Sequence, residues 1–174
     1  MKSLLTFSRS SAEAERQGVD LNEAVREALA LVSAQTHQRD IPLVSELSPS
    51  LPTLWASKVQ IQQVLVNLCN NALDAMPKGG MLTVSTGVER QPDGEHVVLK
   101  VRDTGVGIPE AIRTRIFEPF FTTKDVGKGT GLGLALVYEM VQNHGATIDV
   151  QSAEGAGTLF TLIFPAQQSK AQAV

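Results

Sequence analysis

The sequence is poor in the residues that mark several protein classes. Its 174 residues include a single cysteine, Cys69, so no disulfide can form within the chain. No apolar run approaches the roughly 18–20 residues that cross a bilayer, and the N-terminus lacks the apolar core of a signal peptide. A formal net charge of -3 gives no general attraction for nucleic acid or for an anionic membrane. We therefore expect no nucleic-acid partner, no membrane contact and a cytoplasmic location.

The composition fits one globular domain with a good-sized core, since 43% of the residues are hydrophobic. Capping residues and apolar periodicity predict long helices after Asp20, from Ser57 to about Ala75, and from Leu132 to near Gly145. A short helix is expected over 109–115. Strand patterns occupy 41–47, 81–88, 97–103, 147–152 and 158–164. Helices on one side of a mixed sheet predict an α+β fold, a two-layer α/β sandwich.

The two ends of the chain differ in pattern from the domain at 19–166. Leu4, Leu5 and Phe7 fit one helical face, and Gly18 reads as a helix stop. Residues 1–18 carry too little apolar surface to fold alone, so we expect the end of a helix that belongs to a preceding domain. Residues 167–174 are polar and are expected to form a disordered tail.

Carboxamides replace the usual charges on one face of the second helix. Asn67 and Asn71 are four residues apart and project side by side, with Asp74 on the same face. An Asn carbonyl oxygen is a neutral, hard ligand suited to Mg²⁺ that is already shared with phosphate oxygens. For this helix alone a plain polar or capping face is the simpler interpretation, and the other motifs reverse it.

The next motif is Asp103-Thr-Gly-Val-Gly107, which follows a strand and turns the backbone sharply. A carboxylate at the end of a strand accepts a hydrogen bond from an exocyclic amine, which adenine has and guanine replaces with a carbonyl. Taken singly, the motif is equally a turn signal or an aspartic-protease loop. The long helices argue against the protease alternative.

A stretch of little regular pattern lies between residues 108 and 130. Three of the six phenylalanines, Phe117, Phe120 and Phe121, gather there. Long loops in compact domains are usually functional covers or disordered. The cluster is therefore either local core or part of a cover that docks on a neighbouring surface when nucleotide is bound.

Lys124 and Lys128 flank a glycine-rich segment, Gly127–Gly133, that opens the third helix. Backbone amides at a helix N-terminus bind phosphate, and glycines let the backbone approach it. The spacing differs from a Walker P-loop, and the segment follows a loop rather than the strand of a dinucleotide-binding unit. The three histidines, in contrast, are expected to be ordinary surface or capping residues.

With these motifs in this order, residues 20–165 resemble the catalytic ATP-binding domain of two-component sensor histidine kinases, in the wider group of gyrase, Hsp90 and MutL ATPases. The resemblance implies the Bergerat fold, with a mobile ATP lid and with ATP and Mg²⁺ as cofactors. It implies Asn71 as the metal ligand, Asp103 as the adenine partner, and Asn67 and Lys124 as catalytic residues. The implied nucleotide-binding residues come from these motifs and from the start of the last strand: Asn67, Asn71, Asp74, Asp103, Gly105, Gly107, Ile108, Phe121, Thr122, Thr123, Lys124, Gly129, Thr130, Gly131, Leu132, Gly133 and Thr158.

Position 67 helps to divide this group of proteins. The hydrolases of the group carry a Glu there as a general base toward water, whereas Asn67 cannot take up a proton at neutral pH. The resemblance thus favours transfer of the γ-phosphoryl group to a histidine on a phosphoacceptor helix, and from there to a response-regulator aspartate. The alternatives are a regulatory nucleotide-binding module or a slow ATPase. Residues 1–18 resemble the end of the second helix of the dimerisation and phosphoacceptor domain, whose acceptor histidine this chain lacks.

Overall fold

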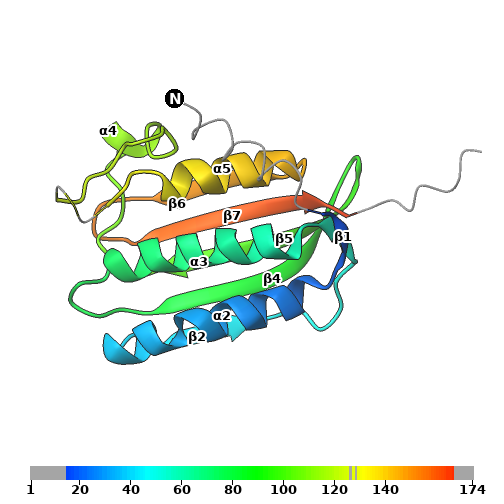
Figure 1. The fold of residues 1–174 in the computed structure, drawn as a ribbon, viewed down its shortest axis with the longest axis horizontal. Coiled ribbons are helices and arrows are strands. Elements are labelled where there is room, and N and C mark those ends of the chain that lie inside the picture. Colours follow the sequence, from blue (N-terminus) through cyan, green and yellow to red (C-terminus); the bar gives the residue numbers. More distant parts are fainter. Residues whose placement is uncertain (1–14, 126, 128, 167–174) are drawn as a thin grey trace, which may run out of the picture.

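Two layers make up the part of the chain that the computed structural model describes, residues 15–125, 127 and 129–166 (Figure 1). The helical layer consists of α2 (Leu21–Gln38), α3 (Lys58–Asp74) and α5 (Gly133–Asn143), with the short α4 (Glu110–Arg113) near one end. The main sheet consists of β2 (Leu43–Glu46), β4 (Leu82–Gln91), β5 (Gly94–Asp103), β6 (Thr147–Ser152) and β7 (Thr158–Pro165). The two-layer α+β sandwich predicted from the sequence is confirmed.

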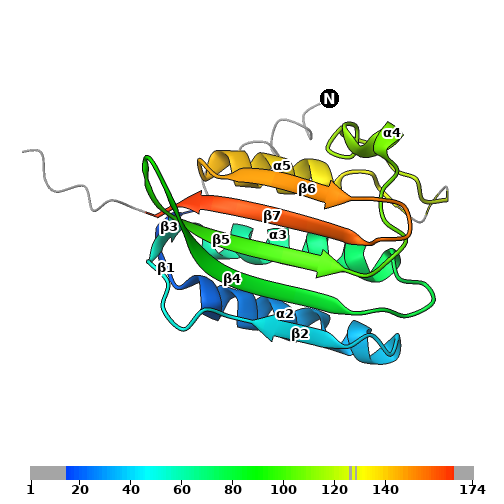
Figure 2. The same ribbon diagram turned by 180° about the vertical axis from the view of Figure 1, so that it is seen from behind.

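The sheet is mixed, with strand order β2-β4-β5-β7-β6. Only β2 and β4 pair in parallel, and the other neighbours are antiparallel. The long helices cover one face, and in the view from behind no helix of the described residues lies over the other face (Figure 2). Asp103, the last residue of β5, lies opposite Leu82 at the start of β4 and Thr158 at the start of β7. This register brings three strand ends together at one edge of the sheet.

Side-chain caps fix where the first two long helices begin. Asp20 accepts a hydrogen bond from the Glu23 amide at 3.2 Å, and Ser57 accepts one from the Gln60 amide at 3.4 Å. Each helix then buries an apolar face on the sheet. Gln60, a polar residue in the first turn of α3, is only 7% exposed because α3 packs against both α2 and α5. Among the described helices, none combines the length and apolarity that a bilayer crossing needs.

The N-terminal boundary differs from the one expected. Gly18 was expected to stop a helix, but Gln17–Val19 form strand β1, which pairs antiparallel with β3 (Leu54–Ala56). Val19 is buried at 2% exposure, so the strand belongs to the core of this domain. The domain therefore begins before residue 19. The remaining expectations for the two ends, residues 1–14 and 167–174, lie outside the described residues.

His144 is not an ordinary capping histidine, because its ring connects the end of α5 with the N-cap residue of α3. Its Nδ1 lies 2.6 Å from the Met140 carbonyl oxygen, and its Nε2 accepts a hydrogen bond from the Ser57 amide at 3.1 Å. This pair of partners requires the neutral ring with the proton on Nδ1. Burial lowers the pKa of His144, assisted by the charge of Arg16 and opposed by the hydrogen bond to Met140.

The lowered pKa predicts a pH dependence of folding. Because the folded state disfavours the charged ring, the stabilisation is complete above the ordinary value of 6.5 and is lost as the pH falls below it toward the lower folded-state value. Urea unfolding between pH 7.5 and 5 should show a declining free energy of unfolding, and His144→Gln should flatten that decline. His37→Gln, which removes an exposed histidine of α2, is the matched control. An unchanged slope in the His144 variant would contradict this account.

Candidate nucleotide-binding site

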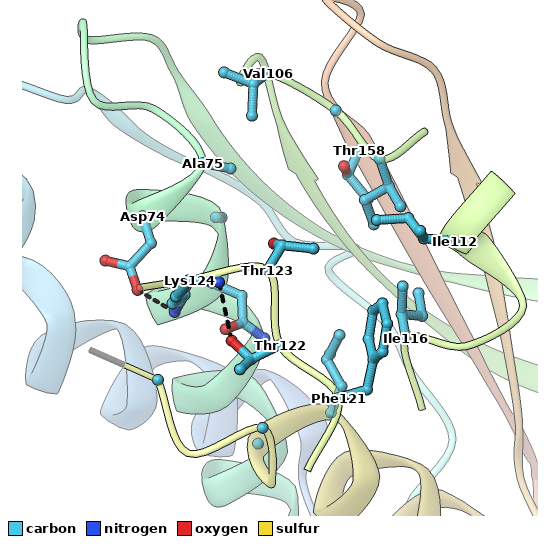
Figure 3. Close-up of a pocket in the computed structure, with 18 of the residues that line it drawn as sticks. Asp74, Ala75, Val106, Ile112, Ile116, Phe121, Thr122, Thr123, Lys124 and Thr158 are labelled. Atoms are coloured by element: carbon cyan, nitrogen blue, oxygen red, sulfur yellow. Dashed lines mark hydrogen bonds and ion pairs between the residues drawn. The ribbon is translucent and has the colours of Figure 1, made fainter. Parts of the chain in front are cut away.

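A cavity of about 580 Å³ opens where α3, the end of β5 and the segment before α5 meet (Figure 3). Figure 3 shows Asp74 and Lys124 on one side of this cavity, with Thr158 and Ile112 on the other. Its lining is apolar along one wall and polar along the other. The residues that line it are Asn71, Ala72, Asp74, Ala75, Asp103, Val106, Gly107, Ile108, Pro109, Ile112, Ile116, Phe121, Thr122, Thr123, Lys124, Gly129, Thr130, Gly131, Gly133, Leu134, Glu154, Thr158 and Phe160.

Asp103 is the buried acid of this cavity, with 6% of its surface exposed. The Gly105 amide donates a hydrogen bond of 2.8 Å to its Oδ1. Burial raises the pKa of Asp103, and the backbone amides of Gly105 and Thr158 oppose that shift. A carboxylate has more acceptor sites than these two amides fill, so Asp103 can accept a further hydrogen bond from a ligand donor in the cavity.

Two glycines let backbone pack directly on backbone beneath this acid. A Cβ on Gly107, whose φ is +74°, would lie 1.9 Å from the Ala153 carbonyl oxygen. A Cβ on Gly157, whose φ is +75°, would lie 2.1 Å from the carbonyl oxygen of Asp103 itself. Only glycine fits such contacts, so these positions fix how the β6–β7 turn lies against the end of β5.

Ser152 joins the same two segments, and no motif in the sequence distinguishes it. Its Oγ accepts a hydrogen bond from the Ile108 amide at 2.7 Å and donates one to the Gly157 carbonyl oxygen at 2.8 Å. The same oxygen lies 2.9 Å from Thr158 Oγ1. Ser152 therefore supports the Thr158 side of the cavity, although the sequence predicts it only as the last residue of the strand over 147–152.

The carboxamide face of α3 divides into two parts. Asn71 lines the cavity, as does Asp74. Asn67 lies beside the cavity instead, where its Nδ2 donates to the Gly133 carbonyl oxygen at 3.4 Å and its Oδ1 accepts from Gln63 at 3.0 Å. The neutral oxygen donor of Asn71 fits a divalent cation that phosphate oxygens already hold, because it adds no negative charge there.

The segment before α5 covers the polar wall. Lys124 Nζ lies 2.5 Å from Asp74 Oδ2, and the Lys124 amide donates to Thr122 Oγ1 at 3.1 Å (Figure 3). Leu132, the N-cap residue of α5, makes no side-chain cap, so the first-turn amides of the helix have no partner within it. Unpaired amides at a helix N-terminus are a favourable place for phosphate.

The phenylalanines of this segment serve different purposes. Phe117 packs into the core, with its ring 5.4 Å from that of Tyr138 and 6.5 Å from that of Phe160. Phe121 lines the cavity beside Ile116, whereas Phe120 is 74% exposed. The core interpretation is thus confirmed for Phe117, whereas a cover that docks when nucleotide is bound stays a prediction.

Most of the residues predicted from the sequence lie together. The predicted residues that line the cavity are Asn71, Asp74, Asp103, Gly107, Ile108, Phe121, Thr122, Thr123, Lys124, Gly129, Thr130, Gly131, Gly133 and Thr158. Asn67, Gly105 and Leu132 do not line it but contact residues that do. The apolar wall of Ile112, Ile116 and Leu134 was not predicted, since apolar side chains in a helix or loop give no signal that separates core from cavity.

The family model for histidine kinase-, DNA gyrase B- and HSP90-like ATPases matches residues 56–168. The chain belongs to this family. Among curated proteins it is 39% identical over 176 residues to sensor kinase CckA of Brucella abortus, covering 95% of this chain and 18% of CckA. It is 41% identical over 149 residues to sensor histidine kinase ZraS of Escherichia coli, covering 86% of this chain and 31% of ZraS. The chain thus spans between about a fifth and a third of these relatives.

Solved structures of histidine kinases share the fold. The catalytic domain of ThkA superposes with a TM-score of 0.76 at 31% identity, covering 87% of this chain and 96% of that domain. ShkA, solved full-length in complex with AMPPNP, gives 0.75 at 31% identity, covering 86% of this chain and 31% of ShkA. ThkA in complex with the response regulator TrrA gives 0.71 at 25% identity, covering 89% of this chain and 43% of that one. The fold expected from the resemblance is confirmed.

The contact beneath Asp103 predicts how two neighbouring glycines differ. Gly155→Ala and Gly157→Ala both place a side chain at a φ near +75°, but a Cβ on Gly155 meets open space. Both variants should carry the cost of the left-handed backbone, about 1–2 kcal/mol. Gly157→Ala should lose a further ~1–3 kcal/mol of unfolding free energy because the methyl group meets backbone. Equal losses by urea unfolding would contradict the packing described here.

Proposed function

We propose that this chain is the ATP-binding catalytic domain of a sensor histidine kinase. It transfers the γ-phosphoryl group of ATP to a histidine on a phosphoacceptor helix. The observation that carries the proposal is one cavity that holds the buried Asp103 acceptor, the Asn71 oxygen donor and the N-terminus of α5. The kinship with CckA and ZraS and the AMPPNP complex of ShkA support it.

In this proposal the adenine lies at the Asp103 end of the cavity. The carboxylate accepts a hydrogen bond from the exocyclic amine of the base. Gly105 and Gly107 shape the pocket around it, and Thr158 supports the base from the start of β7. Ile108, together with Ile112 and Ile116 of the apolar wall, supplies a surface for the flat face of the ring.

The triphosphate lies toward the N-terminus of α5. Amides of the segment 129–133, with Thr122, Thr123 and Thr130 nearby, donate to its oxygens, and Lys124 offsets their charge. Asn71 is the metal ligand in this proposal, with Asp74 at the rim. The side-chain oxygen of Asn71 would hold Mg²⁺, and the ion would supply positive charge against the negative charge of the triphosphate.

The position of Asn67 favours transfer over hydrolysis. Its amide cannot accept a proton at neutral pH, and both of its polar atoms are engaged, one with Gly133 and one with Gln63. Asn67 therefore cannot act as a general base that activates a water molecule for hydrolysis. In the transfer, the unprotonated ring nitrogen of the acceptor forms a bond to the γ-phosphorus. The bond from that phosphorus to the bridging oxygen breaks, and ADP leaves with the electron pair.

The remaining partners follow from the same proposal. The acceptor histidine lies on the dimerisation and phosphoacceptor helices of the kinase, and the phosphoryl group then passes to an aspartate of a response regulator. The ThkA–TrrA complex supports a response regulator as partner. We place the reaction in the cytoplasm, where ATP and Mg²⁺ are plentiful.

A transfer assay tests the proposal. The chain is mixed with the phosphoacceptor helices of its kinase, supplied as a separate protein, and with Mg²⁺ and γ-labelled ATP. The acceptor should gain acid-labile label, and Asn71→Ala should reduce the rate by at least about tenfold, since it removes a metal ligand. Glu89→Gln is the matched control because it lies at the far end of β4 from the cavity.

Three other outcomes would each replace the proposal. Release of free phosphate without a labelled acceptor would indicate a slow ATPase. Acid-stable label would indicate a kinase that modifies hydroxyl groups. Binding of ATP with neither product would indicate a regulatory nucleotide-binding module.

A further inference from the structure

Three charged side chains from three separate elements meet at the rim of the cavity. Arg39 stands at the C-terminal end of α2, Asp74 is the last residue of α3, and Lys124 belongs to the segment before α5. Arg39 Nη1 lies 3.1 Å from Asp74 Oδ1, and Lys124 Nζ lies 2.5 Å from Asp74 Oδ2. Each cation therefore holds a different oxygen of the same carboxylate, and Figure 3 shows the Lys124 side of this cluster.

The backbone fixes the place of Arg39. The Arg39 amide donates to the Gln35 carbonyl oxygen at 3.2 Å, and the Ile41 amide donates to the Thr36 carbonyl oxygen at 3.0 Å. Asp40 takes a left-handed conformation with a φ of 50°, and Ile41 is buried at 4% exposure. The end of α2 is thus closed by a buried anchor, which holds Arg39 over the end of α3.

Binding of a triphosphate changes the charge balance of this cluster. In the proposed function Lys124 turns toward a phosphate oxygen inside the cavity and away from Asp74 Oδ2, which lies 2.5 Å from its Nζ in this structure. When it leaves, Asp74 remains as a carboxylate beside a highly negative ligand, and like charges at short range repel. Partial burial acts to raise the pKa of Asp74, but the hydrogen bonds and charges of Lys124 and Arg39 outweigh it and lower that pKa.

We propose that Arg39 is a positioning residue for nucleotide binding, which holds and balances the Asp74 carboxylate while Lys124 moves to the terminal phosphate of ATP. Arg39 does not line the cavity, so it acts through Asp74 and not by touching the nucleotide. An arginine guanidinium presents several N–H donors in a planar fork, which suits a counter-ion for a carboxylate. The inference rests on the proposed function, because it takes Lys124 as a phosphate ligand.

Because the three charged side chains are partly exposed, we expect their ion pairs to affect nucleotide affinity and not folding stability. The side chains of Arg39, Asp74 and Lys124 are 43%, 37% and 36% exposed, and such ion pairs contribute little to folding. The loss of Arg39 should therefore leave the unfolding midpoint nearly unchanged. Its effect should appear in nucleotide affinity, because only there does Asp74 lose its second partner.

Calorimetric titration with Mg²⁺ and a non-hydrolysable ATP analogue tests the inference. Arg39→Gln should bind the analogue about three- to tenfold more weakly than the wild type, with a smaller change for ADP, which lacks the terminal phosphate. Arg39→Lys should keep most of the affinity. Arg26→Gln, which removes an exposed arginine of the same helix, is the matched control for net charge. Adding Asp74→Asn to Arg39→Gln should restore the affinity, since no carboxylate then needs balancing.

Two results would overturn the role of Arg39: an Arg39→Gln affinity equal to that of Arg26→Gln, or a double variant as weak as Arg39→Gln alone. Lys124→Gln separates this failure from that of the proposed function. If it binds the analogue like the wild type, Lys124 is not a phosphate ligand and the Arg39 inference falls, whereas the proposed function, which rests on Asp103, Asn71 and α5, stands. If the wild type itself does not bind the analogue, both fall. If Arg39→Gln does not fold, the single variant Asp74→Asn tests the inference instead. The account predicts that Asp74→Asn binds the ATP analogue more tightly than the wild type, and equal or weaker binding would overturn it.

Discussion

The arrangement of the segments around the cavity depends on one buried carboxylate at the end of a strand. Asp103 is 6% exposed, and burial of a charge is costly unless hydrogen-bond donors surround it. The Gly105 amide supplies one donor, and this requires the chain to turn immediately after β5. That turn presses Gly105 against the carbonyl oxygen of Ala75, where a Cβ would lie 2.3 Å away. The end of α3 and the end of β5 are thereby locked together.

The other half of the site depends on the same arrangement. Because β5 pairs with β7, Thr158 lies opposite Asp103 and the Gly157 backbone rests on it. Because α3 is fixed at its end, Asn71 faces the cavity and Asn67 reaches the first residue of α5. The end of the cavity that we propose for the triphosphate is therefore formed by neutral amides and by a helix N-terminus. Asp74, the carboxylate on the α3 side of the rim, is covered by two cations.

The sequence predicted the parts of this site that depend on residue type. Asn71, Asp103 and Lys124 are polar side chains in distinctive short motifs, and Asp20 and Ser57 are caps with local partners. The parts it did not predict are contacts between backbone segments far apart in the chain. The pairing of Gly18 with Trp55 in β1 and β3 depends on such a contact, because strands this short carry no alternation pattern. Ser152 and His144 likewise gain their roles only from partners that the fold brings to them.

Adenine recognition by Asp103 is the central claim, and nucleotide titration of Asp103→Asn tests it most directly. The variant keeps an oxygen for the Gly105 amide, so it should fold. Its side chain is neutral, and an NH₂ group replaces the second carboxylate oxygen, so the charged acceptor for the exocyclic amine of adenine is lost. The affinity for ATP should fall by at least about tenfold, which corresponds to the loss of a hydrogen bond to a charged group. The affinity for GTP should fall much less, so the preference for ATP narrows. Unchanged affinity for ATP in a folded variant would contradict the account.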